Sequence, residues 1–246
     1  MIKSRLILFQ MEKLKQGATQ LGINLTPGQL EKFEIYYREL IEWNKKVNLT
    51  AITGYEEVQV KHFLDSLTVI TAINPDSLKL IDIGTGAGMP GIPLKIVSPG
   101  IDLTLLEATT KKAKFLEHLI DRLELDKVVI VIGRAEEIGH DVQYREKFDV
   151  VLSRAVAALP TLVELTLPFC KVGDCFIAQK KGDIEKEIET SLKAIEVMGG
   201  KLREIKPVEI EGLDDKRCLV VIDKVRPTPL EYPRRPGMPA KKPILS

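Results

Sequence analysis

The stretch Asp82-Ile-Gly84-Thr-Gly86-Ala-Gly88-Met-Pro-Gly91 joins an expected β-strand at 78–83 to an expected helix at 91–97. Glycine adopts positive φ without steric cost, so this run lets the backbone turn tightly beneath a ligand. The spacing Gly86-x-Gly88-x-x-Gly91 matches the dinucleotide-binding fingerprint. The stretch therefore predicts a nucleotide-binding loop and leaves the choice of nucleotide open.

Polar residues at the ends of the expected strands help to distinguish which nucleotide the loop would bind. Asp82 ends the first strand, where it can act through the loop or a water on the amino-acid part of a ligand, a charge that dehydrogenases seldom need. Glu107 ends the second, about 20 residues past the glycines, where a carboxylate accepts hydrogen bonds from ribose. Ala135 and Glu136 follow the third strand, where the adenine edge of S-adenosylmethionine would lie, and Arg154 follows the fourth. A plain turn and a solvated helix start remain the alternatives for the glycines and Glu136.

The order of elements after residue 75 predicts an α/β fold. Short β-rich runs alternate with helical segments and end in two consecutive strands, 201–210 and 217–223, which predict a closing hairpin. Five βα units and such a hairpin are typical of the Rossmann-like, seven-stranded methyltransferase fold, whereas dinucleotide dehydrogenases usually continue with a sixth parallel unit. The expected strands are 78–83, 101–106, 128–132, 148–152 and 175–179, and the expected helices are 91–97, 110–123, 135–142, 159–169 and 184–197.

Helical patterns dominate the first 75 residues. Thr26-Pro-Gly-Gln29 combines a hydroxyl cap, proline at the first helical position and glutamine three residues after the cap, which predicts a helix to about Lys46. Helices are also expected at 14–21 and 56–73. We expect three regions: an N-terminal helical region at 1–75, an S-adenosylmethionine-binding methyltransferase domain at 76–224, and a basic, proline-rich tail at 225–246. Residues 1–10 are a possible extension, because Met11 could itself be a translation start.

Composition is that of an ordinary folded protein, with 29% charged residues and a net charge of +1 over 246 residues. The net charge of the whole chain therefore does not indicate a polyanionic partner. The tail, however, carries five basic residues and one acidic residue, a net charge of +4. Its cations are Arg226, Arg234, Arg235, Lys241 and Lys242. Three cysteines without a C-x-x-C spacing favour buried thiols over a metal site. The opening apolar run is too short for a membrane span, which predicts a cytosolic protein without a membrane partner.

Six segments together resemble the RsmG (GidB) family of bacterial 16S ribosomal RNA guanine-N7 methyltransferases, and the match covers about Met11 to Pro243. They are Trp43-Asn44-Lys-Lys-Val-Asn48-Leu-Thr50, Lys61-His-Phe-Leu-Asp-Ser66, the glycine loop 82–91, Ser153-Arg154-Ala-Val-Ala157, Lys180-Lys181-Gly182 and Tyr232-Pro-Arg-Arg-Pro-Gly-Met-Pro-Ala-Lys241. The resemblance implies methylation of guanine N7 at position 527, in the 530 loop of the small-subunit RNA, with S-adenosylmethionine converted to S-adenosylhomocysteine.

The same resemblance implies cofactor contacts at Gly84, Met89, Ala135, Glu136 and Arg154. The residue-based interpretation adds Asp82, Gly86, Gly88 and Glu107 to this set. Met89 departs from the family pattern, in which a larger apolar residue, often phenylalanine, follows the last glycine. Methionine can still pack on a ligand.

Guanine N7 presents a bare lone pair, so its methylation needs no proton removed and no general base. The protein must instead align and desolvate the reactants. Asn48, Arg154 and Lys181 are the expected substrate-positioning residues, and Asn44, Lys180, Arg234, Arg235, Lys241 and Lys242 are expected to contact RNA. The alternatives are a helix cap for Asn48, an exposed turn at 180–182, a structural His62–Asp65 pair and a flexible solvated tail. Neutralising the four tail cations is expected to weaken RNA binding and leave cofactor affinity unchanged.

Five functions remain open on sequence alone. The favoured one is the ribosomal RNA methyltransferase, acting as a monomer on the small subunit. A methyltransferase for another RNA is one alternative, and a methyltransferase for a small molecule is another, although it leaves the basic tail and the N-terminal helical region unexplained. An NAD(P)-dependent oxidoreductase fits the glycine spacing and conflicts with the closing hairpin. A ribosome-associated protein that binds the cofactor without turnover is the fifth.

Overall fold

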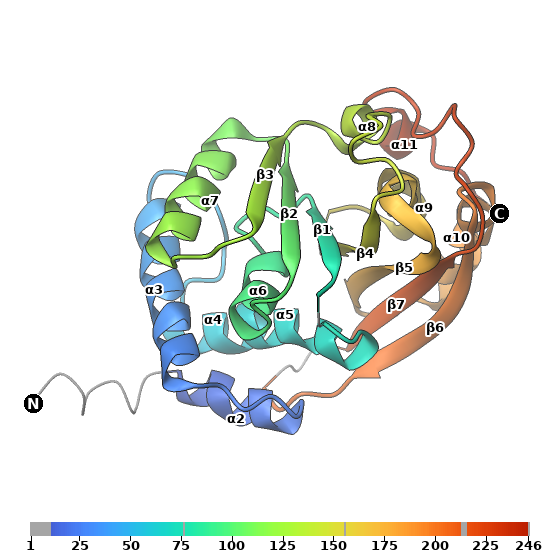
Figure 1. Cartoon of the computed structure of the whole chain (residues 1–246). Helices are drawn as coiled ribbons and strands as arrows, with labels where there is room; N and C mark the ends of the chain where they lie inside the picture. The colour runs from blue at the N-terminus through green and yellow to red at the C-terminus, as the bar shows by residue number, and fades with distance from the viewer. Residues whose placement is uncertain (1–10, 76, 155, 213–215, 246) are drawn as a thin grey trace, which may run out of the picture.

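A seven-stranded mixed sheet forms the centre of the molecule in the computed structural model, which describes residues 11–75, 77–154, 156–212 and 216–245 (Figure 1). The strand order is β3-β2-β1-β4-β5-β7-β6, with β7 antiparallel to both of its neighbours and the remaining pairs parallel. The strands are β1 (Lys79–Ile83), β2 (Asp102–Glu107), β3 (Val128–Ile132), β4 (Phe148–Arg154), β5 (Cys170–Lys181), β6 (Gly200–Val208) and β7 (Arg217–Lys224). This order confirms the predicted methyltransferase topology and its closing hairpin.

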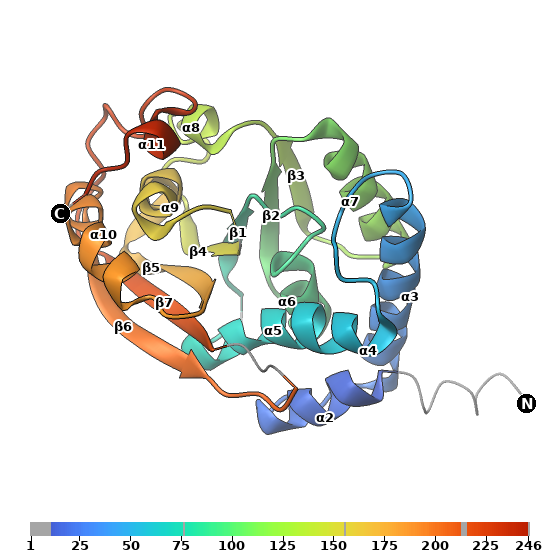
Figure 2. The ribbon, with the colours of Figure 1, turned by 180° about the vertical axis from the view of Figure 1, so that it is seen from behind.

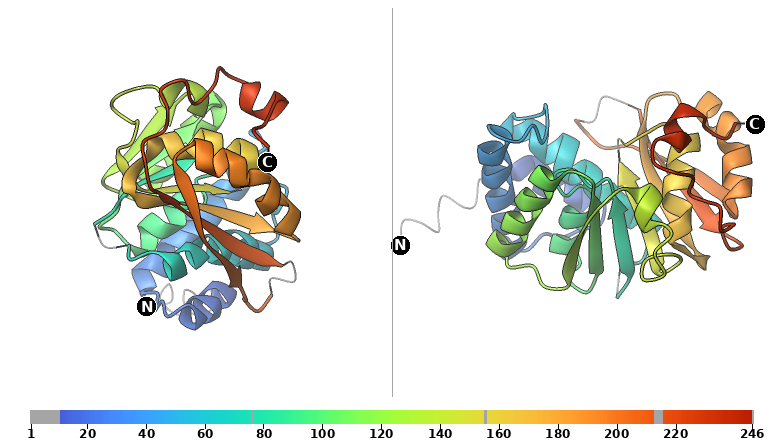
Figure 3. Two further views of the ribbon diagram at one scale, coloured as in Figure 1. Left: turned by 90° about the vertical axis from the view of Figure 1, so that its right-hand side faces the viewer. Right: turned by 90° about the horizontal axis from the view of Figure 1, so that it is seen from above.

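Helices cover both faces of the sheet, because alternate residues of the central strands point to opposite sides (Figures 1 and 2). Leu80 belongs to one buried cluster and its neighbour Ile81 to the other. Figure 3 shows the sheet between its two groups of helices. One group comprises α2 (Glu12–Gln20), α3 (Pro27–Asn44), α4 (Tyr55–Val58), α5 (Asp65–Leu67), α6 (Gly91–Val97) and α7 (Thr110–Arg122); the other includes α8 (Ala135–Ile138), α9 (Leu159–Thr166) and α10 (Glu185–Val197).

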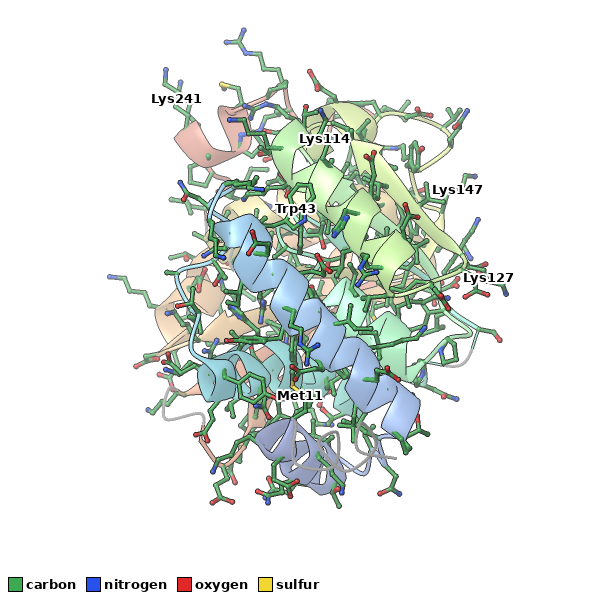
Figure 4. The ribbon with its side chains drawn as sticks, turned by 90° about the vertical axis from the view of Figure 1, so that its left-hand side faces the viewer. Met11, Trp43, Lys114, Lys127, Lys147 and Lys241 are labelled. Atoms are coloured by element: carbon green, nitrogen blue, oxygen red, sulfur yellow. The ribbon has the colours of Figure 1, made fainter. Side chains whose placement is uncertain are left out.

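The N-terminal helices share one hydrophobic core with the sheet. Phe33 and Tyr36 of α3 lie in the same buried cluster as Leu103 and Phe115. Trp43, at the end of α3, packs on α7 with its ring centroid 5.7 Å from that of Phe115 (Figure 4). The described part of the N-terminal region therefore packs on the sheet and shares its core, and the boundary at residue 75 stays a prediction.

Local signals placed α3 correctly, whereas the segment after it is more irregular than predicted. Thr26 and Gln29 form the expected reciprocal capping box, and Pro27 begins the helix. An unbroken helical run at 55–72 confirms the helical region predicted at 56–73, but it changes type along its length, from α4 through a π-helical turn η2 (Gln59–Leu64) and α5 to a 3₁₀ turn η3 (Thr68–Ala72). The predicted helix at 135–142 ends early, at Ile138, and the helix predicted at 159–169 finishes in a 3₁₀ turn, η4 (Leu167–Phe169).

The tail is ordered over residues 225–245, so its interpretation as a flexible terminus is wrong for that range. The Arg145 guanidinium donates to the carbonyl oxygens of Thr228, Pro229 and Tyr232 at 2.8–3.1 Å. A short helix, α11 (Met238–Lys241), follows. Such contacts satisfy backbone acceptors that a proline-rich segment cannot pair within a sheet.

Residues 1–10, named above as a possible extension, lie outside the described residues. Within the described ranges, no helix is long and apolar enough to cross a bilayer. The three cysteines are buried free thiols, and burial raises the pKa of Cys175 to about 11.

Candidate active site

The glycine loop needs its glycines for steric reasons. Gly84, Gly86 and Gly88 have φ values of 69°, 60° and 93°, a region that side chains rarely adopt. A Cβ on Gly88 would lie 2.5 Å from Ile92 Cδ1, and one on Gly84 would lie 2.7 Å from Val156 Cγ2. At Gly86 the nearest atom would be 3.9 Å away, so this position opens onto free space. The loop thus exposes its backbone at Gly86 while packing tightly on either side.

Asp82 holds this loop from beneath. Its side chain is fully buried, and Oδ2 accepts hydrogen bonds from Gly91 N at 2.9 Å and from Thr85 Oγ1 at 2.7 Å. Burial raises the pKa of Asp82 to about 6, although both hydrogen bonds lower it. Oδ1 is buried without a hydrogen-bond partner among the described residues. The carboxylate therefore holds the loop in place, which is the arrangement that an action on a ligand through the loop requires.

Tyr36 holds the loop from the other side and was missed by the sequence analysis. Its hydroxyl, brought in by α3, donates to Ala87 O at 2.5 Å inside the buried core. Burial raises its pKa well above the usual value, so the phenol keeps the proton it donates. A tyrosine on an apolar helix face gives no sequence signal that distinguishes this role from core packing.

Removing that hydroxyl should loosen the loop. We expect Tyr36→Phe to raise the Kd for S-adenosylhomocysteine about 5-fold, because a net hydrogen bond contributes about 1 kcal/mol. Tyr37→Phe is the matched control: the next residue of α3 donates its hydroxyl to Thr53 O at 3.2 Å, away from the loop. Calorimetric titration compares the two variants, and equal Kd values would count against a role for Tyr36 in the site.

Glu107 occupies the expected place at the end of β2. Oε2 accepts from Gly86 N at 3.0 Å and Oε1 from Thr109 N at 2.8 Å, with only 5% of the residue exposed. A carboxylate fixed by two backbone amides is preorganised to accept further hydrogen bonds. The second strand therefore presents an oriented acceptor beside the glycine loop.

A cavity of about 200 Å³ opens beside this loop. Ala135 and Glu136 of α8 line it together with Gly84, as the sequence analysis predicted for the cofactor pocket. The Glu136 carboxylate also accepts from Gly237 N at 3.0 Å, a contact with the tail that was not predicted. The remaining lining residues are Ile83, Leu106, Ala108, Gly133, Arg134, Val156 and Leu165. Apolar walls, an open glycine backbone and a neighbouring acid fit the adenosine part of S-adenosylmethionine.

Arg154, at the end of β4, joins the loop to the N-terminal helices. Nη1 donates to Asp65 Oδ2 at 3.0 Å, and Nη2 lies 3.1 Å from the Met89 sulfur. The Asp65 side chain is 4% exposed and that of Arg154 14%, so their charges are strongly coupled. Met89, expected to contact the cofactor, is itself 4% exposed and packs under this guanidinium. Arg154 therefore links the glycine loop to α5.

A second cavity, of about 290 Å³, is lined by Arg154, which also contacts Met89 of the glycine loop. Lys180 and Lys181, expected near the substrate, both line it. Lys180 forms an ion pair with Glu187 at 2.7 Å, whereas Lys181 is exposed. The other lining residues are Ile52, Lys61, His62, Asp65, Gln179, Glu187 and Arg217. Strand ends and N-terminal helices thus enclose a polar, largely cationic space beside the glycine loop.

The structure gives Asn44 a different role from the predicted RNA contact. Its Oδ1 accepts from Leu49 N and Thr50 N at 2.7 and 2.9 Å, and its Nδ2 donates to Thr50 O at 2.9 Å. The side-chain amide of Asn44 therefore closes the loop after α3 through three hydrogen bonds. Asn48, at the exposed tip of that loop, remains available for RNA.

His62 is a neutral structural residue at physiological pH. Nε2 lies 2.7 Å from Thr50 Oγ1, so the proposed pairing of His62 with Asp65 is replaced by one with Thr50, and Asp65 pairs with Arg154. Burial, and secondarily the charge of Arg154, lower the pKa of His62 to about 4.

This depressed pKa makes a testable contribution to stability. The unfolded chain binds a proton at His62 near pH 6.5 and the folded chain only near pH 4, so stability present above pH 6.5 is lost as the pH falls to 4. Urea unfolding should show wild type losing about 3 kcal/mol relative to His62→Gln across this window. The raised pKa of Asp82 changes the free energy of unfolding with pH in the opposite direction. Because both proteins contain Asp82, this contribution cancels when they are compared. If the difference in unfolding free energy between the two proteins stayed constant over this pH range, the lowered pKa of His62 would be contradicted.

The tail cations divide into two kinds. Arg234 forms a bidentate ion pair with Glu164, whose side chain is fully buried, so its predicted contact with RNA phosphate is replaced by an internal one. Arg235, Lys241 and Lys242 are exposed, and Figure 4 shows Lys241 at the outer side of α11. These three keep the chemistry expected for phosphate binding.

Several solved structures share the fold of this chain. TYW2 from M. jannaschii, crystallised in complex with AdoMet, superposes with a TM-score of 0.54 at 18% identity, covering 72% of this chain and 81% of that one. Precorrin-6y C5,15-methyltransferase from Geobacter metallireducens gives a TM-score of 0.51 at 15% identity, covering 70% and 90%. These likenesses show the fold of the chain, a Rossmann-like seven-stranded sheet with a closing hairpin.

Sequence comparison identifies the particular family. Residues 29–217 match the model of the GidB family, rRNA small subunit methyltransferase G. The chain is 50% identical over 235 residues to ribosomal RNA small subunit methyltransferase G of Dehalococcoides mccartyi, covering 96% of this chain and 100% of the relative. The protein of that name from Acetivibrio thermocellus is 49% identical over 231 residues, covering 94% and 95%. The chain belongs to the GidB family.

Proposed function

We propose that this enzyme transfers the methyl group of S-adenosylmethionine to N7 of the guanine at position 527, in the 530 loop of 16S ribosomal RNA. Family membership supports an rRNA substrate in the small subunit. The observation that carries the finer proposal is the position of Arg154, which contacts Met89 of the glycine loop and also lines the cavity that contains Lys180 and Lys181.

Each cavity has the chemistry for one reactant. Gly84, Gly86, Glu107 and the α8 residues Ala135 and Glu136 would hold the cofactor, which supplies an electrophilic methyl carbon when bound. Asp82 keeps the glycine loop in place from below. The cationic second cavity would receive the guanine, with Arg154 and Lys181 positioning it and Asn48 contacting flanking RNA.

The reaction places few demands on side-chain acid–base chemistry. N7 carries no proton, so the chain has only to exclude water and hold N7 in line with the methyl carbon. His62, the histidine that lines the second cavity, is neutral and bonded to Thr50, in keeping with this requirement. We propose no general base.

We further propose that the enzyme acts as a monomer in the cytoplasm, where small subunits are found.

The tail cations should add affinity for RNA. Replacing Arg235, Lys241 and Lys242 together by glutamine is expected to reduce RNA binding and to lower the magnitude of the slope of log K against log salt by about 2, because three phosphate contacts are lost. Filter binding at several salt concentrations measures both effects. An unchanged slope would remove these residues from the RNA-binding surface.

Labelled S-adenosylmethionine, incubated with small subunits from a strain lacking the modification, tests the proposal. We expect label in 16S RNA, recovered after digestion as 7-methylguanine at position 527. Label in another nucleotide or in a small molecule would overturn the substrate assignment, and cofactor binding without transfer would indicate a binding protein.

A further inference from the structure

The C-terminal segment, defined here as residues 232–242, lies against the helices that follow β3 and β4. Pro233 O accepts from His140 Nε2 at 2.7 Å, and Pro239 O accepts from Thr161 Oγ1 at 3.1 Å. A Cβ on Gly139 would lie 2.9 Å from Pro233 Cγ, so the proline ring packs closely on the Gly139 backbone. Figure 3 shows this part of the chain running past α8 and α9.

Those two helices are also walls of the cofactor cavity. Ala135 and Glu136 of α8 and Leu165 of α9 line it. The segment therefore covers the outer side of the elements whose inner side faces the adenosine pocket.

Arg234 anchors the segment to α9 through a buried acid. Glu164, adjacent to the cavity residue Leu165, is fully buried and accepts from the Arg234 guanidinium at 2.6 and 2.9 Å and from its backbone N at 2.8 Å. The hydrogen bond to Glu164 raises the pKa of Arg234. A carboxylate with no solvent exposure requires such a partner, which makes this the fixed point of the segment.

The segment reaches the cavity itself three residues later. Gly237 N donates to Glu136 Oε1 at 3.0 Å, and Gly237 adopts a φ of 82°, which turns its amide toward α8. Glu136 is thus held by a residue 101 positions away in sequence.

We infer that the C-terminal segment is part of the cofactor site, and that Arg234 is a positioning residue that fixes Glu136 through Gly237. Its neighbour Arg235 is exposed and keeps its expected role in RNA contact. On this inference the two adjacent arginines have different functions, and neutralising all four tail cations should change cofactor affinity as well as RNA binding. The identity of the ligand rests on the proposed function.

The two arginines supply a matched pair for the test. Arg234→Gln should raise the Kd for S-adenosylhomocysteine about 10-fold in calorimetric titrations, the effect of one lost charge-assisted hydrogen bond. Arg235→Gln should leave that Kd within about 2-fold and weaken RNA binding instead. Under saturating cofactor, Arg234→Gln should recover kcat, so that the loss appears in KM.

A double variant, Arg234→Met with Glu164→Leu, guards against simple unfolding, because it leaves no buried unpaired carboxylate. It should fold and still show the raised Kd. Wild-type Kd in either Arg234 variant, even with a lowered Tm, would reduce the ion pair to a structural role and overturn the inference. Wild-type protein that is folded and binds no S-adenosylhomocysteine would instead overturn the proposed function on which the inference rests.

Discussion

Replacing Arg154 with methionine is expected to reduce methyl transfer about 100-fold, the effect of misplacing reactants by roughly 1 Å. The guanidinium lines the cavity that also contains Lys180 and Lys181, and it touches both Asp65 and the Met89 sulfur of the glycine loop. Without it the glycine loop and α5 lose their shared contact, and the reactants lose their alignment. Single-turnover transfer to small subunits measures the effect directly.

Stability should fall as well, by up to about 3 kcal/mol, because Asp65 is left buried with less compensation. Arg217 Nη1, 3.7 Å from Asp65 Oδ2, limits the loss. The double variant Arg154→Met with Asp65→Asn should therefore recover stability without recovering activity. Arg203→Met, which breaks a more exposed pair with Asp223, is the matched control. Full methyl-transfer activity in Arg154→Met would show that the reaction takes place away from Arg154.

Glu107→Ala is expected to raise the Kd for S-adenosylmethionine by about 100-fold or more, since it removes at least two charge-assisted hydrogen bonds worth roughly 1.5 kcal/mol or more each. One consequence is direct, the loss of an acceptor for ribose. The other is the release of Gly86 N and Thr109 N, which the carboxylate now holds. Calorimetry of the purified variant provides the measurement.

Glu117→Ala supplies a control on the exposed side of α7. It should leave the Kd unchanged. Near wild-type affinity in Glu107→Ala would mean that the strand-end acid only shapes the loop, and would reopen the identity of the ligand.

Much of the fold could be predicted because local signals and global packing agree. Thr26 and Gln29 determine where α3 begins, and consecutive strands at 200–208 and 217–224 predict the closing hairpin. The strand-end positions of Glu107 and Arg154 follow from strand boundaries alone, since parallel strands end at one edge of the sheet. These features need only short stretches of sequence.

The remaining site residues depend on contacts between distant segments. Glu164 pairs with Arg234 across 70 residues, and Tyr36 reaches Ala87 across 51. Glu164 did offer a signal, as a single acid within the apolar run 159–169, which implies a buried partner without naming it. The sequence of residues 59–64 carries no signal for the π-helical turn found there.

Binding of the cofactor tests the account most directly. Calorimetric titration of the folded protein with S-adenosylhomocysteine should give one site per chain, and a parallel titration with NADH should give no heat of binding. Saturable binding of NADH, or no binding of S-adenosylhomocysteine, would contradict the assignment of the cavity beside the glycine loop.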